Sequence, residues 1–296
     1  MPRRILIVGC GYVGLAAGAE LVCQGHQVWG LRRSRKANAQ LESAGIEPLN
    51  ADVTVAASLP VQKKRFDWVI HCLSASGGGP AEYRQTYVEG TRCVLNWLAA
   101  VPPERLVYTS STSVYGQTDG SLVDETSATA PRTQTGVVLL EAEQVLWREA
   151  RVGACVLRVG AIYGPGRSYW LDRLLAGEAR LDGQGTRLLN MIHRDDVAGA
   201  ICAALNRGEP GRIYNAVDDE PVRQLDLLDW LCRRLGRALP APSSADDTGP
   251  RKRGLTSKRV SNRRLHEELG YRFKFPSFKD GLEQILADRD RDMSQR

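Results

Sequence analysis

A glycine triplet near the start of the chain constrains the fold more than any other sequence feature. Gly9, Gly11 and Gly14 stand at Gly-x-Gly-x-x-Gly spacing. They follow the apolar, β-branched run Ile5 to Val8, which favours a buried parallel strand. The residues from Tyr12 to Gln24 then have the pattern of a helix. The spacing therefore predicts a strand, a tight turn and a helix, which together open a dinucleotide-binding βαβ unit.

Each glycine has a separate role in such a turn. Gly9 allows the tight turn, Gly11 lets a pyrophosphate approach the backbone, and Gly14 lets the helix pack on the strand. The helix N-terminus presents free N–H groups and the positive end of its dipole to phosphate. A tight turn without a ligand is the alternative. We expect the cofactor-binding residues of this turn to be Gly9, Cys10, Gly11, Tyr12, Val13 and Gly14.

Strand-like and helix-like segments alternate along the first part of the chain. After the first strand, strands are expected at 27–31, 46–50, 67–73, 105–110 and 154–159. Helical patterns lie between them, at 35–44, 81–100 and 135–151. This alternation favours a parallel sheet with helices on both faces. We therefore predict an α/β fold, a doubly wound parallel sheet of the Rossmann type.

The alternation weakens beyond Gly164, which suggests a division of the chain. We expect residues 1–165 to form an NADP-binding Rossmann domain, completed by a returning strand near 211–217. Residues 166–296 are expected to form a smaller, mostly helical substrate-binding lid, with helices at 225–235, 262–269 and 278–287. The Pro-, Ser- and Asp-rich stretch 238–250 is typical of a loop.

Composition and charge exclude several kinds of partner. Hydrophobic residues make up 43% and charged residues 25%, which is typical of a globular protein. The net charge is +6, but the arginines are scattered except between Arg251 and Arg264. That basic run either binds an anionic group or is a solvated helix face. No basic recognition helix with aromatic stacking partners is visible, so we expect no nucleic acid partner.

Cysteines and histidines indicate neither disulfides nor a metal. The seven cysteines are dispersed without a Cys-x-x-Cys motif, which is typical of reduced cysteines in a cytoplasmic protein. The four histidines are too far apart for a local metal motif, so no metal site is predicted. The first apolar run is too short for a signal-peptide core or a membrane span. We expect a cytoplasmic protein without a membrane partner.

The end of the second strand indicates which dinucleotide is bound. A fold that selects NAD usually carries an Asp or Glu there, on the ribose 2′-hydroxyl. Here Arg32, Arg33 and Ser34 follow Leu31, and no acid is present. Arginine side chains pair well with a phosphate, whereas an acid would repel it. The sequence therefore favours NADP(H), the alternative being two solvated arginines on a loop.

Two further strand ends supply candidate cofactor residues. Asp52 and Val53 follow the third strand, where they would reach the adenine edge and pack on its face. An Asp in an ordinary loop is the alternative there. Leu73, Ser74 and Ala75 end the fourth strand, at the carboxyl edge where open α/β sheets bind their ligands.

Six sequence blocks resemble a known family. They are VGCGYVG at 8–14, YVEGTRCVLNWL at 87–98, YTSSTSVYG at 108–116, LRVGAIYGPGR at 157–167, NMIHRDDVAGAI at 190–201 and KRVSNRRLHEELGY at 258–271. In this order they resemble the short-chain dehydrogenase/reductase superfamily, specifically its extended NAD(P)-dependent epimerase/dehydratase branch. The resemblance spans nearly the whole chain.

The resemblance implies roles for several residues. Ser111 would hydrogen-bond the carbonyl or hydroxyl of the substrate. The residues Val159, Gly160 and Ala161 would pack beside the nicotinamide. Two helices, at 81–100 and 135–151, often form a dimer seam in this superfamily, so a homodimer is expected.

The family's acid/base pair is missing from its usual place. In the family this pair is a Tyr-x-x-x-Lys on the helix after the fifth strand, and here the two positions carry Thr135 and Leu139. A threonine hydroxyl is too weak an acid to replace a tuned phenol, and leucine has no charge or donor. Tyr115 and Tyr163 are the remaining candidate phenols near the pocket, and we take Tyr115 as the candidate catalytic tyrosine.

Two functions follow from these observations. The first is an NADP(H)-dependent oxidoreductase or epimerase-like enzyme of the extended or atypical type, which acts on a small carbonyl, hydroxyl or sugar-derived substrate. The alternative is a non-catalytic NADP(H)-binding protein that reports redox state, similar in this respect to the NmrA-like regulators. Ser111 and Tyr115 favour the enzyme, whereas Thr135 and Leu139 favour the regulator.

Overall fold

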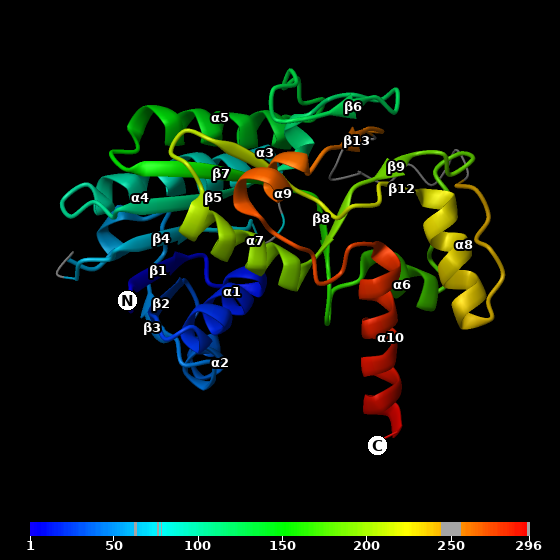
Figure 1. Ribbon diagram of the computed structural model, residues 1–296, viewed down its shortest axis with the longest axis horizontal. Coiled ribbons are helices and arrows are strands. Elements are labelled where there is room, and N and C mark those ends of the chain that lie inside the picture. The colour runs from blue at the N-terminus through cyan, green and yellow to red at the C-terminus, as the bar shows by residue number, and fades with distance from the viewer. Residues whose placement is uncertain (62–63, 76, 78, 244–255, 295–296) are drawn as a thin grey trace.

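A seven-stranded parallel sheet forms the centre of the protein (Figure 1). The computed structural model describes residues 1–61, 64–75, 77, 79–243 and 256–294. The strand order is β11-β7-β5-β4-β1-β2-β3, and every pair in this sheet is parallel. The strands are β1 (Arg4–Val8), β2 (Gln27–Arg32), β3 (Glu47–Asn50), β4 (Trp68–His71), β5 (Arg105–Ser111), β7 (Gly153–Val159) and β11 (Ile213–Ala216). The prediction of a doubly wound α/β fold is confirmed.

Helices cover both faces of this sheet because its central strands are apolar on both sides. In β1, Ile5 and Ile7 belong to one hydrophobic cluster, whereas Leu6 and Val8 belong to another. The first face is covered by α1 (Tyr12–Cys23), α2 (Asn38–Ser43), α7 (Arg194–Arg207) and α9 (Arg263–Leu269). The second face is covered by α4 (Gly90–Leu98), which continues α3 (Pro80–Tyr83) and the π-helix Arg84–Glu89, and by α5 (Gln134–Glu149).

A third hydrophobic cluster lies beyond the carboxyl edge of the sheet. Its helices are α6 (Tyr169–Leu175), α8 (Gln224–Leu235) and α10 (Phe278–Ser294). Its short strands are β8 (Ala161–Tyr163), β9 (Leu188–Leu189), β10 (Met191–His193) and β12 (Val222–Arg223). The pair β6 (Leu122–Val123) and β13 (Arg259–Val260) joins the loop after β5 to the C-terminal part of the chain.

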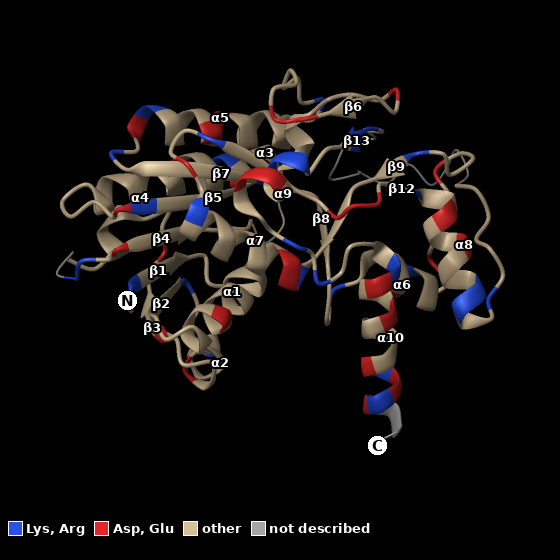
Figure 2. Cartoon of the chain, in the orientation of Figure 1, with Lys and Arg blue, Asp and Glu red and all other residues tan. Residues whose placement is uncertain are grey.

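The chain crosses repeatedly between the sheet and this third cluster. Helices α7 and α9 and strand β11 all follow residue 165, yet they pack on or within the central sheet. Within 238–250, the expected loop, residues 244–250 lie outside the described part of the chain. Figure 2 shows basic and acidic residues interspersed along α8 and α10. None of the helices in the described ranges is both long and apolar enough to cross a bilayer.

A buried ion pair connects the helix layer to the sheet beneath the carboxyl edge. The Arg158 guanidinium on β7 donates to both carboxylate oxygens of Glu143 on α5, at 3.1 and 2.7 Å. The side chains are only 5% and 2% exposed. Arg158 also donates to the hydroxyl of Tyr115 at 2.9 Å, and that hydroxyl donates to Asn215 on β11 at 2.9 Å. The network thereby joins three elements that converge below the site.

We predict that Glu143→Ala destabilises the protein by about 3–5 kcal/mol, because it leaves a buried guanidinium without its counter-charge. The matched control is Glu141→Ala on the same helix, whose ion pair with Arg84 is exposed. That change should cost no more than about 1 kcal/mol. Urea unfolding measures both variants. Equal losses for the two would contradict the role given to the buried pair.

Candidate functional site

The turn after β1 is pressed against the end of β4. Gly9 has a φ of +84°, and a Cβ built on it would lie 2.6 Å from the carbonyl oxygen of Cys72. A Cβ on Gly14 would lie 2.9 Å from Cγ2 of Ile7, so only glycine lets α1 approach β1 this closely. Gly11 differs, because its nearest neighbour would be the Gly9 carbonyl oxygen at 3.8 Å. A side chain therefore does not fit at Gly9 or Gly14, whereas the space beside Gly11 is open.

The first N–H groups of the turn are used within the protein. Those of Gly9 and Cys10 both donate to the carbonyl of Leu31 at 3.1 Å, and that of Gly11 donates to Gly9 at 2.6 Å. Burial raises the pKa of the Cys10 thiol to about 12, so this side chain is an inert core group. Gly9 and Cys10 thus shape the turn, and their N–H groups are used within it. Their contact with the cofactor stays a prediction.

The backbone N–H groups that remain to bind a ligand belong to the residues that follow Gly11. The first helical hydrogen bond of α1 is donated by Leu15 to the carbonyl of Gly11, at 2.8 Å. The N–H groups of residues 12–14 precede that bond, at the positive end of the helix dipole. No side chain caps this end of the helix. Tyr12, Val13 and Gly14 are therefore the residues whose backbone fits a pyrophosphate.

Tyr12 also joins the turn to the loop after β8. Its hydroxyl donates to the carbonyl of Pro165 at 3.1 Å. The guanidinium carbons of Arg167 and Arg194 lie 5.5 and 5.2 Å from the centre of its ring. The Tyr12 side chain is thus held between two cations beside the expected phosphate position.

We predict that Gly11→Ala weakens NADPH binding at least about tenfold while the midpoint of thermal unfolding hardly changes, because the added methyl meets only the ligand. Gly9→Ala is the matched variant, and it should lower the stability of the fold itself, since its Cβ would overlap the Cys72 carbonyl. Titration of NADPH fluorescence and thermal unfolding measure the two effects. Unchanged affinity in the Gly11 variant would place the cofactor elsewhere.

The ends of β2 and β3 meet at the expected adenosine side. Arg33 is largely exposed, and its guanidinium lies 3.9 Å from a carboxylate oxygen of Asp52. The other Asp52 oxygen accepts hydrogen bonds from the backbone and hydroxyl of Thr54, at 3.0 and 2.7 Å. Val53 is buried in the core, and the Ser34 hydroxyl caps the next turn by accepting from the N–H of Lys36. The structure thus brings Arg33 and Asp52 together.

The remaining predicted strand ends lie along the same carboxyl edge. Leu73 and Ser74 follow β4, and the N–H of Ala75 donates to the hydroxyl of Tyr87 at 3.4 Å. Val159 ends β7 within the core. After it, the N–H of Gly160 donates to Ala216 at 2.9 Å, and that of Ala161 donates to Asn190 at 2.8 Å. Among these residues, Gly160 and Ala161 line a cavity at the exit of β7.

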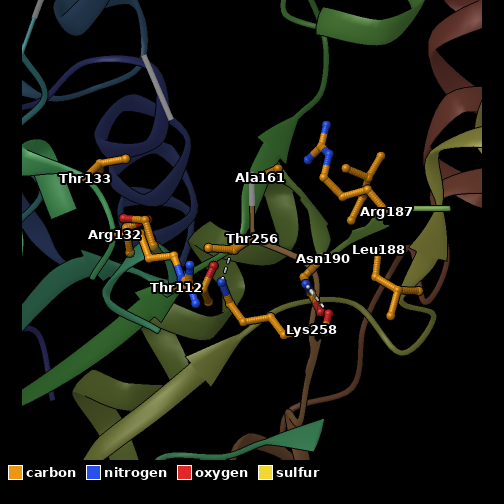
Figure 3. Close-up of a pocket in the computed structure, with 13 residues that line it drawn as sticks. Thr112, Arg132, Thr133, Ala161, Arg187, Leu188, Asn190, Thr256 and Lys258 are labelled. Carbon is orange, nitrogen blue, oxygen red and sulfur yellow. Dashed lines mark hydrogen bonds between the residues drawn. The ribbon is translucent and has the colours of Figure 1, made fainter. Parts of the chain in front are cut away.

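A cavity of about 120 Å³ lies where β5, β7, the β9–β10 segment and the residues before β13 converge (Figure 3). Its walls contain hydroxyl, guanidinium, amide and ammonium groups but, among the described lining residues, no carboxylate. The lining residues are Ser111, Thr112, Ser113, Arg132, Thr133, Gly160, Ala161, Arg187, Leu188, Leu189, Asn190, Thr256 and Lys258. Ser111, the predicted substrate-binding serine, thus shares one cavity with Gly160 and Ala161.

The usual tyrosine and lysine positions contribute nothing titratable to this cavity. The Thr135 hydroxyl lies 3.2 Å from that of Thr133. Leu139 is buried in an apolar cluster that also contains Val114 and Val260. The helix that carries the family's acid/base pair therefore closes the site here with apolar packing.

The two candidate phenols, Tyr115 and Tyr163, also lie outside this cavity. Tyr115 is fully buried, its hydroxyl is held by Arg158 and Asn215, and burial raises its pKa. Tyr163 is buried in the third cluster, where its hydroxyl donates to the carbonyl of Ser277 at 3.3 Å and burial raises its pKa. Neither side chain lines the cavity. The hydroxyl of Tyr115, the candidate catalytic tyrosine, thus belongs to the core network in this structure.

Lys258 is the residue that sequence reasoning missed. It is 3% exposed, and its ammonium donates to the carbonyl of Tyr115 and to the hydroxyl of Thr256, both at 2.9 Å. Burial lowers its pKa to about 8. In the sequence it stands within the basic run 251–264, where nothing separates it from its surface neighbours. Its ammonium points toward Thr256, in the direction of Thr112 and Arg132 (Figure 3).

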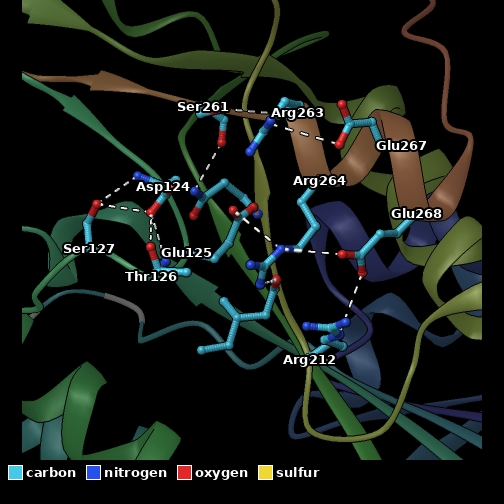
Figure 4. A network of polar contacts seen from close by, with 12 residues as sticks. Asp124, Glu125, Thr126, Ser127, Arg212, Ser261, Arg263, Arg264, Glu267 and Glu268 are labelled. Carbon is cyan, nitrogen blue, oxygen red and sulfur yellow. Dashed lines mark hydrogen bonds and ion pairs between the residues drawn. The ribbon is translucent and has the colours of Figure 1, made fainter.

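The rest of the described basic run is used within the fold (Figure 4). The Arg264 guanidinium lies 3.8 Å from the carboxylate of Glu125, which is buried, and 3.6 Å from the carboxylate of Glu268. Arg263 pairs with Glu267 at 3.9 Å along α9. Residues 251–255 lie outside the described ranges. Across the ranges that are described, no group of three or more His, Cys, Asp or Glu side chains is arranged to hold a metal ion.

Comparison with known proteins identifies the family. A family model described as "NAD dependent epimerase/dehydratase family" matches residues 5–216. Protein YeeZ from Escherichia coli strain K12 is 28% identical over 279 residues, which is 93% of this chain and 97% of that protein. A 3-diazoavenalumate denitrifying reductase from a Streptomyces species is also 28% identical, over 94% and 99% of the two chains.

A solved structure agrees with this relationship over the whole length. The structure of a putative NAD-dependent epimerase/dehydratase from Methylobacillus flagellatus is 34% identical and superposes with a TM-score of 0.81, covering 98% of this chain and 100% of that one. The open turn at Gly11 and the free N–H groups that follow it fit a dinucleotide. The chain therefore belongs to the NAD dependent epimerase/dehydratase family, whose cofactor is a nicotinamide dinucleotide.

Proposed function

We propose that the protein is an NADP(H)-dependent oxidoreductase or epimerase-like enzyme, acting on a small carbonyl, hydroxyl or sugar-derived compound. The observation that carries this proposal is the cavity itself, which places Ser111 of β5 beside Gly160 and Ala161 of the β7 exit. It lies at the carboxyl edge of the sheet, where open α/β folds bind their ligands. The lining hydroxyl and cationic groups suit a polar substrate.

The cofactor would lie across the carboxyl edge from β2 to β7. The N–H groups of residues 12–14 would bind its pyrophosphate, and Gly160 and Ala161 would pack beside its nicotinamide. Arg32 and Arg33 would bind a 2′-phosphate, with Asp52 holding Arg33 in reach. When bound, the cofactor supplies or accepts the hydride.

Ser111 would polarise the substrate oxygen. Its Oγ accepts a hydrogen bond from the N–H of Ser113 at 3.2 Å, which leaves its own proton to donate. A donor fixed in this way stabilises the negative charge that develops on a carbonyl oxygen during hydride addition. The Streptomyces relative is named a reductase, which supports this reaction class.

A non-catalytic, redox-responsive NADP(H)-binding protein is the second candidate. Leu139 favours it, because this residue is sealed in an apolar cluster at the position of the family's catalytic lysine. One activity screen distinguishes the enzyme from the regulator. Tight NADPH binding without oxidation of NADPH by any member of a broad panel of aldehydes, ketones and quinones would favour the regulator.

We predict that Arg32→Ala combined with Arg33→Ala weakens NADPH binding about 10- to 100-fold and leaves NADH binding within twofold, because only the 2′-phosphate loses its charged partners. Fluorescence titration of both reduced cofactors measures the ratio of affinities. Arg148→Ala, on α5, is the control and should alter neither. Equal affinity of the native protein for the two cofactors would refute the NADP preference.

We predict that Ser111→Ala lowers kcat/KM for any carbonyl found in the screen at least about 100-fold without changing the Kd for NADPH. The oxidation of NADPH is followed by its absorbance, and binding by its fluorescence. Ser43→Ala, at the end of α2, serves as the control. A Ser111 variant that turns over at the native rate would remove this hydroxyl from the site.

Assembly and location complete the proposal. A homodimer would form through α4 and α5, and α5 exposes the apolar side chains of Val137 and Trp147, which are 51% and 37% exposed. We propose that the protein acts in the cytoplasm.

A further inference from the structure

Reduction of a carbonyl needs a proton for the oxygen as well as a hydride for the carbon. The described lining of the cavity offers only three titratable side chains, those of Arg132, Arg187 and Lys258. An arginine does not release its proton near neutral pH. We propose that Lys258 is the proton donor of the reaction, in place of the missing tyrosine. This inference rests on the proposed function, because it assigns a step at the same site.

The hydrogen bonds of Lys258 leave one donor for a substrate. A lysine ammonium has three N–H groups. Two are directed to the Tyr115 carbonyl and the Thr256 hydroxyl, both at 2.9 Å. These two acceptors fix the position of the Lys258 Nζ and therefore also the direction of its third N–H. Since Lys258 lines the cavity together with Ser111, a substrate oxygen there meets a hydroxyl donor and an ammonium donor.

The backbone around Lys258 is fixed to the exit of β7. Asn190 donates through its side-chain amide to the carbonyl of Lys258 at 3.0 Å and accepts from the N–H of Val260 at 2.8 Å. The backbone carbonyl of the same Asn190 accepts from the N–H of Ala161 at 2.8 Å. One residue thus connects the lysine segment to the residues expected beside the nicotinamide.

The burial of Lys258 favours release of its proton. Of the two other cations of the cavity, Arg132 donates to the Gly116 carbonyl at 2.8 Å, next in the chain to the Tyr115 carbonyl that Lys258 binds, and Arg187 donates to Asp182 at 2.7 Å. No carboxylate among the described lining residues neutralises the ammonium. Burial lowers the pKa of Lys258 to about 8, in the range that an acid needs to work near neutral pH.

The step balances with the proposed cofactor. The carbonyl carbon gains the hydride, and the π-electron pair of the C=O bond moves to the oxygen. Lys258 gives one N–H proton to that oxygen, which becomes a hydroxyl, and the lysine is left as a neutral amine. A proton from water restores the ammonium. In the oxidative direction, the neutral amine accepts the hydroxyl proton.

The first test compares Lys258→Arg with Lys258→Met. Arginine keeps the positive charge but does not release its proton near neutral pH, whereas methionine has neither the charge nor a proton to give. Both variants should lower kcat at least about 100-fold with the Kd for NADPH within twofold. Lys279→Met, an exposed residue paired with Glu220, is the control and should keep native turnover. Native turnover in the arginine variant would overturn the proposal, because charge alone would then suffice.

The pH profile provides a readout that a structural role would not change. The donor must carry its proton, so kcat for reduction should fall as pH rises through about 8 in the native protein. The residual activity of Lys258→Arg should lack that fall. If kcat of the variant fell over the same pH range, the titrating group would be another residue, and the proposal would be overturned.

A second measurement needs neither turnover nor cofactor. Trace labelling with acetic anhydride at a series of pH values, read by mass spectrometry, gives the titration of each lysine in the native protein. Lys258 should titrate near pH 8, because burial lowers its pKa to about 8. A midpoint at the ordinary value of a lysine, about 10.4, or no reaction at any pH, would overturn the proposal. Absence of NADPH binding alongside a low midpoint would instead refute the proposed function, so the two failures are distinguishable.

Discussion

The architecture of the site depends on the close approach of two backbones at the centre of the sheet. β1 and β4 are neighbours, and the turn after β1 presses Gly9 against the carbonyl of Cys72 at the end of β4. A side chain at Gly9 would separate them, and its φ of +84° is accessible mainly to glycine. This contact directs the start of α1 over the carboxyl edge, so the helix N–H groups face the space where the ends of β2, β5 and β7 also lie.

A second constraint connects the core to the chemistry. The hydroxyl of Tyr115 is held in the network of Arg158, Glu143 and Asn215, while its backbone carbonyl accepts from Lys258. The ion pair below the sheet edge and the lysine in the cavity therefore share one residue. A tyrosine placed in this way positions another side chain rather than reacting itself. Asn190 fixes the same lysine from the opposite side.

The fold and the cofactor turn were predictable because their signals are local. The glycine spacing, the apolar runs and their alternation with helices each appear within one short segment, and the described strands follow them. The same reasoning did not foresee where the Tyr115 hydroxyl lies, since no local pattern reveals that Arg158 and Asn215, 43 and 100 residues away, hold it. It also missed Lys258, which stands in a basic run of the sequence and whose ammonium is held by the carbonyl of Tyr115, 143 residues away.

The central claim is that a dinucleotide lies across the turn at residues 9–14. Hydrogen–deuterium exchange on nucleotide-free protein, with and without saturating NADPH, tests it most directly, because the N–H groups of residues 12–14 have no helical acceptor of their own. The account predicts slower exchange in peptides covering this turn and the end of β2 when NADPH is present. Unchanged exchange in both segments would contradict it.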